Sequence, residues 1–458
     1  MGNFWDFSSW GFFNLIAVLL GSLLLGNMLK RSVPLLRNSL IPTSVLGGGI
    51  LLLASVIYKS VTGSEMFDTA FFGGKGSAWL ELLTYHMLAL GFTASALKTT
   101  EGKITKERGI EIFNTGLTTV ATYVLQALVG MLVCIVAAFF LDDLLEAAGL
   151  LLALGYGQGT GQAMNYGGIY EMEYGFVGGK SFGLTVAAMG FLSASFGGVI
   201  HLNWLKRKGK ISLDKGSGIS SEQVEGDNEI PMQDSIDKFT LQIAFIMVAY
   251  LLAYLLMYFL GQLIPGLRST IYGFNFLLGV LSATVLKNII NFFHKRGIIH
   301  RHYTNNFLLT RAPNFFFDIM VTAGIAAIRM SIIGKYWAVL LVMGVLGLVV
   351  TYFYVYFVCR KLFPNYVEQQ FLGMYGMLTG TASTGIILLR EIDGDFKTPV
   401  ADNLVYQNFP AMVFGFPILL LATMAPNRPY LTLGIVVVFL VIMNLLLFRS
   451  FLFKKKAK

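Results

Sequence analysis

The sequence predicts an all-α integral membrane protein that crosses the bilayer many times. Of its 458 residues, 55% are hydrophobic and 13% are charged, whereas a soluble domain carries about 25% charged residues. Apolar runs of about 20 residues, the length that spans a bilayer as a helix, recur from one end of the chain to the other. The net charge of +9 does not indicate nucleic-acid binding, because the basic residues lie between the apolar runs.

We expect five membrane-spanning helices in each half of the chain and an extra one at the C-terminal end. The spans of the first half are expected near residues 11–29, 39–58, 79–97, 113–140 and 181–205. Those of the second half are expected near residues 240–264, 271–292, 313–330, 336–359 and 402–424, and the extra span near 429–452.

Two stretches rich in Gly and Thr occupy matching places in the two halves. Residues 155–162 read Gly-Tyr-Gly-Gln-Gly-Thr-Gly-Gln, and residues 376–385 read Gly-Met-Leu-Thr-Gly-Thr-Ala-Ser-Thr-Gly. Glycine inside a helix costs about 0.8–1.0 kcal/mol relative to alanine, so unwound backbone is expected. Close helix packing through small residues is the alternative, although the glycines of 155–161 would fall on opposite faces of one helix. We expect re-entrant hairpins at 147–175 and 366–398.

The basic residues predict the orientation in the membrane. Cytoplasmic loops are enriched in Lys and Arg. An outside N-terminus, an inside C-terminus and two re-entrant hairpins leave few basic residues outside: Lys59, Lys75, Lys180, Arg268, Arg329, Lys335 and Arg428. Because the first half has an odd number of spans, the second half is inverted, and the hairpin tips should approach each other near the bilayer midplane. The predicted parts are a first repeat, a cytoplasmic linker, an inverted second repeat, and an extra span with a basic tail, at 1–205, 206–238, 239–427 and 428–458.

The hairpins have the chemistry of a binding site for ions and small polar molecules. Unwound backbone inside a membrane must line a cavity or be buried in protein. Freed carbonyls and hydroxyls suit a hard cation such as Na⁺, while freed N–H groups and helix N-termini suit a carboxylate. The predicted cation ligands are Thr160, Thr379, Thr381 and Asp318. The predicted substrate-binding residues are Gln158, Gly159, Gly161, Gln162, Asn165, Gly380, Ser383 and Thr384.

Several ionisable residues have both a functional and a structural interpretation. An ionisable residue inside a span is a candidate functional residue, which applies to Asp318 and to His86. The alternatives are a water-reached Asp318 and a neutral His86 bonded to a backbone carbonyl. Arg390 either contacts a substrate carboxylate or is a surface charge. The remaining groups are expected to cap helices or to lie in solvent without a specific role: Glu171, Glu173, Glu391, Asp393, His201, His294, His300 and His302.

The first hairpin resembles that of the bacterial sodium–glutamate symporter family. Residues 157–163 read Gly-Gln-Gly-Thr-Gly-Gln-Ala, and an acidic residue and Tyr174-Gly175-Phe176 follow. Residues 41–49, Ile-Pro-Thr-Ser-Val-Leu-Gly-Gly-Gly, are similar to the family's Ile-Pro-x-x-Val-x-Gly-Gly segment. The second hairpin departs from the family's Gly-x-Gly-x-Gly-Ala-Thr-Pro pattern, and the last span is extra. The resemblance implies inverted five-span repeats, a homodimer and Na⁺-coupled uptake of glutamate.

The expected function is secondary active transport, by Na⁺-coupled symport of glutamate or a related small carboxylate across the cell membrane. A carrier of another organic anion driven by H⁺ or Na⁺ is the alternative within transport. An integral-membrane enzyme and a channel are further alternatives. The sequence has no His and Cys cluster with transition-metal spacing, no Gly-Lys-Ser/Thr phosphate loop and no nucleophile elbow, so neither an enzyme nor a cofactor is expected. Na⁺ is the expected coupling ion.

Overall fold

The computed structural model describes residues 3–98, 105–209, 236–298, 301–394 and 397–452. It divides into two compact units, which we describe separately. The first comprises Met1–Glu81, Ile104–Ser217 and Val321–Lys458, and the second Leu82–Lys103 and Gly218–Met320. The described residues contain helices and no β-strand. Most of the predicted linker, the end of the basic tail and His300 lie outside the described residues.

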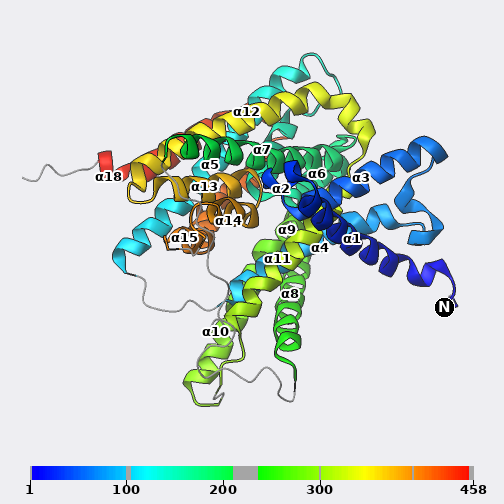
Figure 1. The fold of residues 1–458 in the computed structure, drawn as a ribbon, viewed down its shortest axis with the longest axis horizontal. Helices are drawn as coiled ribbons and strands as arrows, with labels where there is room; N and C mark the ends of the chain where they lie inside the picture. The colour runs from blue at the N-terminus through cyan, green and yellow to red at the C-terminus, as the bar shows by residue number, and fades with distance from the viewer. Residues whose placement is uncertain (1–2, 99–104, 210–235, 299–300, 395–396, 453–458) are drawn as a thin grey trace, which may run out of the picture. The chain divides into compact units, whose positions relative to one another are not determined.

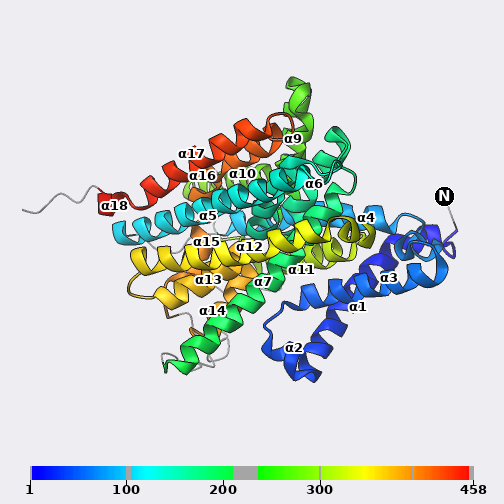
Figure 2. The same ribbon diagram turned by 90° about the horizontal axis from the view of Figure 1, so that it is seen from above.

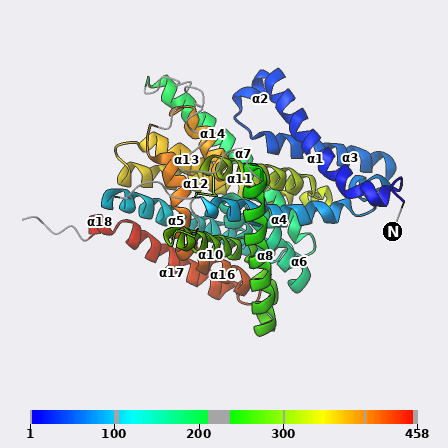
Figure 3. The ribbon, with the colours of Figure 1, turned by 90° about the horizontal axis from the view of Figure 1, so that it is seen from below.

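The first unit contains both predicted hairpins and the helices packed on them. Within it α12 packs against α5, α7 and α13, and α16 and α17 pack against α5 (Figures 1 and 3). Helices α1 and α3 form a pair (Figure 2). The helices wholly within this unit are α1 (Phe7–Ser32), α2 (Pro34–Asn38), α3 (Thr43–Thr62), α5 (Lys106–Ala138), α6 (Thr160–Tyr174), α7 (Gly179–Arg207), α12 (Met330–Leu362), α13 (Val367–Thr379), α14 (Ala382–Arg390), α15 (Val400–Tyr406), α16 (Asn408–Met424), α17 (Pro429–Leu447) and α18 (Arg449–Leu452).

The second unit is built on α8 (Lys238–Leu263), α9 (Arg268–Gly273) and α10 (Asn275–Lys295). Helices α4 (Gly76–Leu97) and α11 (Asn306–Ala326) each cross the boundary between the units. Apolar side chains of four helices form the core of the second unit, namely Leu90, Ala94, Leu97, Ile246, Ala249, Ala283, Leu309, Ala312 and Phe316.

The structure confirms an α-helical protein of the multi-pass membrane type. Within the described residues, nine helices are long and apolar enough to cross a membrane, and the pair α15 and α16, bent by 47°, would be a tenth. Many of their apolar side chains are exposed, including Leu251 and Phe259 of α8 and Val438 of α17. A soluble protein rarely exposes apolar surface on this scale, so lipid is the natural solvent of these faces.

Two of the expected spans differ from the prediction. The span predicted at 402–424 is two helices that meet at Gln407. The span predicted at 313–330 is α11, which starts earlier because Asn305 Oδ1 accepts the Leu308 N–H at 2.8 Å and caps the helix. Polar residues such as Arg311 and Asp318 leave α11 outside the set of strongly apolar helices. The predicted repeats and their inverted topology stay predictions.

Candidate functional site

The first hairpin is broken at Gln158 and Gly159. Residues Ala153–Gly157 form a turn of π-helix before the break, and α6 begins directly after it at Thr160. Gly159 has φ 83° and ψ −172°, a conformation that is accessible to glycine and strained for other residues. The break is shorter than the predicted unwound stretch, because Gly161 already lies in the first turn of α6.

The second hairpin is broken at Gly380 and Thr381. Helix α13 ends at Thr379, Thr381 is extended with φ −140° and ψ 171°, and α14 begins at Ala382. The first N–H groups of a helix have no partner within it. The two breaks therefore each lead into a helix N-terminus, that of α6 and that of α14, where backbone donors and the helix dipole favour a negative group.

Helix α7 contacts both hairpins near their breaks. A methyl group at Gly190 would collide with the carbonyl oxygen of Thr379 and would lie 3.1 Å from the ring of Tyr156. One turn further along, the hydroxyl of Ser193 is 2.8 Å from the Tyr156 hydroxyl, and the Ser193 carbonyl accepts a hydrogen bond from Tyr375 at 2.8 Å. Because Tyr156 precedes the first break and Tyr375 precedes the second, α7 brings the two broken helices together.

Gln126 of α5 joins the two hairpins from another direction. Its Nε2 donates to the carbonyl of Leu378 and to Thr351 Oγ1, both at 2.9 Å. Its Oε1 lies close to Gly157: a methyl group added to that glycine would be 3.2 Å from it. The Gly157 carbonyl accepts a 2.8 Å hydrogen bond from the Tyr123 hydroxyl. The amide of Gln126 thus lies beside the first break and holds the last turn of α13 before the second.

Three buried polar atoms around this junction lack hydrogen-bond partners in the described part of the chain. They are Thr160 Oγ1, Gln162 Nε2 and Gln126 Oε1, on side chains that are at most 1% exposed. A buried polar group without a partner costs about 1–3 kcal/mol, so a structure does not usually retain several of them in one region. The two oxygens are possible ligands of a cation, and the amide nitrogen is a possible donor to an anion.

The other predicted site residues of the first unit lie at or beside the two breaks. Gln158 and Gly159 form the first break, and Asn165 Nδ2 donates to Gln162 Oε1 at 3.1 Å. This bond occupies the oxygen of Gln162 and directs its nitrogen elsewhere. At the second break, Thr381 and Thr384 bring their hydroxyls within 3.3 Å, and Thr379 donates its hydroxyl to the Tyr375 carbonyl. Ser383 lies between the two threonines, and Gly380 is buried.

Asp318 and His86 belong to the second unit. Asp318 is exposed on α11, and its predicted part in the cation site stays a prediction. His86 Nδ1 lies 2.7 Å from the Tyr250 hydroxyl, so its partner is a side chain and not the backbone carbonyl that was the alternative. Arg390 is exposed at the end of α14.

Two acidic residues at the hairpin ends accept hydrogen bonds from main-chain N–H groups. Glu171 accepts the N–H of Lys180 at 3.2 Å in the first turn of α7, and Asp393 accepts the N–H groups of Lys397 and Thr398 at 2.7 and 3.0 Å. Glu171 thus has the expected capping role, whereas Asp393 is buried and bonds to the loop before α15, which is neither the expected helix cap nor a solvated position. Burial raises the pKa of Glu391, and the charge of Lys30 opposes that rise.

A polar stripe on α5 was missed in the sequence. Its members are buried and share one face of the helix: Thr115, Thr118, Thr119, Thr122 and Gln126. Each threonine donates to the carbonyl four residues earlier. Two members of the stripe also reach other helices: Thr115 Oγ1 accepts a hydrogen bond from Gln370 Nε2 of α13 at 3.2 Å, and Gln126 donates to Leu378 and Thr351. Spacings of three and four residues inside an apolar span would have revealed the stripe.

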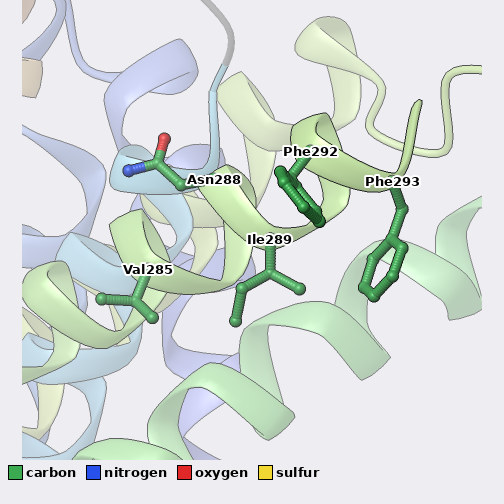
Figure 4. Close-up of a pocket in the computed structure, with 5 residues that line it drawn as sticks. All are labelled: Val285, Asn288, Ile289, Phe292 and Phe293. Atoms are coloured by element: carbon green, nitrogen blue, oxygen red, sulfur yellow. The ribbon is translucent and has the colours of Figure 1, made fainter. Parts of the chain in front are cut away.

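The second unit carries an open apolar groove on α10. Val285, Asn288, Ile289, Phe292 and Phe293 line it (Figure 4). All five residues come from one helix and four are apolar, so the groove lacks the converging polar groups that mark a binding site for a small polar ligand. It is typical of a lipid-facing surface.

No protein-family model matches the chain, and no curated protein sequence matches it. The fold and the junction of broken helices therefore define the class on their own: a multi-pass α-helical membrane protein with two discontinuous helices that meet at buried polar side chains. Within that class, the likeness to the sodium–glutamate symporter family depends on the motifs at residues 41–49 and 157–176.

Proposed function

We propose that this protein is a secondary transporter that couples Na⁺ to the uptake of glutamate or a related small carboxylate by alternating access. The observation that supports this most directly is the junction where Gln126 and α7 contact both broken helices. In transporters, paired broken helices supply half-helix N-termini for anionic groups and unwound carbonyls for cations. The lipid-exposed helices around the junction are consistent with a protein of the cell membrane.

The unpaired atoms suit two different ligands. Thr160 Oγ1 and Gln126 Oε1 can give oxygen to Na⁺, which as a hard cation prefers oxygen ligands. Gln162 Nε2 can donate to a carboxylate, and the N-terminus of α6 adds backbone donors and a favourable dipole. A site that holds both a cation and an anion in close proximity would bind each more tightly in the presence of the other, which is the thermodynamic basis of symport.

The energy source in this proposal is an ion gradient. Alternating access requires that the junction open to each side in turn, and the broken helices are the elements that could rearrange, since their ends are joined by only two non-helical residues each. The same geometry would serve a carrier of another organic anion, or one driven by H⁺, so the substrate and the ion are the properties to measure. A homodimer is the assembly that the family resemblance implies.

The test is uptake of radiolabelled glutamate into proteoliposomes that contain the purified protein. With an inward Na⁺ gradient, we expect accumulation above the external concentration, and we expect collapse of the gradient to abolish it. Competition by unlabelled acids then ranks the substrates. Equilibration without accumulation under every gradient would indicate a channel, and absence of uptake for all carboxylates would refute the proposal.

A further inference from the structure

His201 is buried at the interface of three helices of the first unit. It lies on α7, is 1% exposed, and has a partner on each ring nitrogen. Nδ1 is 2.8 Å from the Tyr352 hydroxyl of α12, and Nε2 is 2.8 Å from Glu368 Oε2 of α13. The sequence predicted no specific role for this histidine, because the basic residues near it placed it beside a solvated loop.

Aromatic rings enclose the imidazole. Ring centroids lie at 4.3 Å for Phe371, 5.4 Å for Trp204 and 5.4 Å for Tyr356. Two cations lie over these aromatic side chains: Lys208 Nζ is 4.2 Å from the Trp204 ring, and the Arg360 guanidinium is 5.8 Å from the Tyr356 ring. The charged and titratable groups that face the pair from the three helices are Lys208 from α7, Tyr352, Tyr356, Cys359 and Arg360 from α12, and Glu368 from α13.

We infer that His201 and Glu368 form a proton-binding site at the base of the second hairpin. With neutral His201, Nε2–H donates to Glu368 and Nδ1 accepts from the Tyr352 hydroxyl. When a proton from solvent binds Nδ1, that nitrogen donates to the Tyr352 oxygen, and only the hydroxyl hydrogen must turn. A hydroxyl can donate or accept, so both protonation states keep both hydrogen bonds without movement of the heavy atoms.

Charged and aromatic side chains surround the imidazole, and one of them gives a proton a route to it. The carboxylate of Glu368 is a charge-assisted partner for an imidazolium, and the faces of Trp204 and Phe371 attract a cation. Glu368 lies in the first turn of α13. Its side chain is 20% exposed, so protons reach His201 past the carboxylate although the imidazole itself is buried.

Proton binding strengthens the contact between α13 and α7. When His201 binds a proton, its neutral hydrogen bond to Glu368 becomes an ion pair. Glu368 lies on α13, which is the first limb of the second hairpin. Movement of α13 away from α7 would separate Nε2 from the carboxylate and release the proton. This consequence for transport rests on the proposed function, whereas proton binding itself does not and is measured without substrate.

Trp204 is the natural reporter of the bound proton, because an imidazolium quenches a nearby indole. The experiment uses the full-length protein in nanodiscs with the other four tryptophans, Trp5, Trp10, Trp79 and Trp337, replaced by phenylalanine. Emission is recorded between pH 4.5 and 8.5. We expect one reversible transition, with lower emission at low pH. Glu368→Gln should move its midpoint to lower pH, because the imidazolium loses its charge-assisted partner.

Two further variants make the result specific. His201→Gln should remove the transition, and His86→Gln, which changes a histidine of the second unit that also bonds to a tyrosine hydroxyl, should leave it intact. If His201→Gln fails to fold, the midpoint of the emission transition in Glu368→Gln tests the inference by itself. An unchanged midpoint in Glu368→Gln, a transition that persists in His201→Gln, or emission that does not vary with pH would each overturn the inference.

Discussion

The amide nitrogen of Gln126 donates to the main-chain carbonyl of Leu378 at 2.9 Å, across 252 positions of sequence. The acceptor lies in the last turn of α13, directly before the second break, and the same side chain faces the first break at Gly157. One buried glutamine therefore connects two broken helices from opposite halves of the chain.

Replacing Gln126 with leucine should weaken both the fold and substrate uptake. The substitution leaves the Leu378 carbonyl and Thr351 without their donor, at a cost of about 1–3 kcal/mol. Thermal unfolding in detergent and initial uptake rates are the measurements. Gln242→Leu is the matched control, because Gln242 is equally buried and its amide also donates to a main-chain carbonyl, that of Tyr303 in the second unit. Equal loss of uptake in the two variants would contradict a special role for Gln126.

Thr160→Val should raise the Na⁺ concentration for half-maximal uptake without loss of stability. The Thr160 hydroxyl has no hydrogen-bond partner in the described structure, so its removal costs no internal bond. If it is a Na⁺ ligand, a loss of about 1.4 kcal/mol raises the half-activating concentration about tenfold. The control is Thr185→Val, whose hydroxyl is bonded within α7 to the Ser181 carbonyl. Normal Na⁺ activation of Thr160→Val would move the cation site elsewhere.

Gln162→Leu should affect the substrate more than the cation. A hydrogen bond to a charged group contributes about 1.5–3 kcal/mol, so the substrate concentration for half-maximal uptake should rise about 10- to 150-fold. Na⁺ activation should change less, although coupling transmits part of the effect. Uptake kinetics at saturating Na⁺ measure the first quantity. A larger change in Na⁺ activation than in substrate affinity would reverse the assignment of Thr160 and Gln162.

Gly190→Ala should disrupt the junction, because the added methyl group meets the Thr379 carbonyl and the Tyr156 ring. Overpacking of this kind costs about 1–3 kcal/mol and would push the second break away from α7. We expect reduced thermal stability and loss of uptake. Gly21→Ala in α1 adds the same methyl group where no atom lies within 4 Å, and it should retain stability and activity. Wild-type behaviour of Gly190→Ala would contradict the close contact of α7 with the hairpin.

The stability of the protein should depend on pH through Glu391. Burial raises its pKa above the ordinary value of 4.5, although Lys30 opposes the shift. A carboxyl with a raised folded-state pKa contributes stability that is present below its unfolded pKa and is lost as pH rises through the folded value. Glu391→Gln should therefore be more stable than wild type at pH 7 and equal to it near pH 4, as measured by thermal unfolding.

The pKa of Asp143 is shifted in the opposite direction to that of Glu391. A hydrogen bond from Lys335 lowers the pKa of this exposed carboxyl, so its contribution is present at neutral pH and is lost as pH falls through the lowered value. Asp143→Asn should reduce stability slightly at pH 7, because exposed ion pairs contribute little, and should match wild type in acid. A Glu391→Gln variant that is less stable than wild type at pH 7 would show that the attraction of Lys30 outweighs burial.

Part of the site could be predicted because it depends on local backbone conformation. Gly159 and Gly380 mark the breaks in both the sequence and the structure, since glycine lowers helix stability wherever it lies. The partners of His201 and Gln126 could not be predicted. The spacing of polar residues can show which face of a helix such as α5 is buried, but it does not show which residues of other helices that face meets.

The sequence alone determined that the chain is an α-helical membrane protein, because the length and composition of its apolar runs leave the bilayer as the only solvent that suits them. It also determined where two helices are interrupted. Only the tertiary structure decided that the interruptions meet, that Gln126 and α7 join them, and that His201 pairs with Glu368. The contacts of Gln126 with Leu378 and of His201 with Glu368 join residues more than 150 positions apart, and packing between helices, rather than any local preference, selects them.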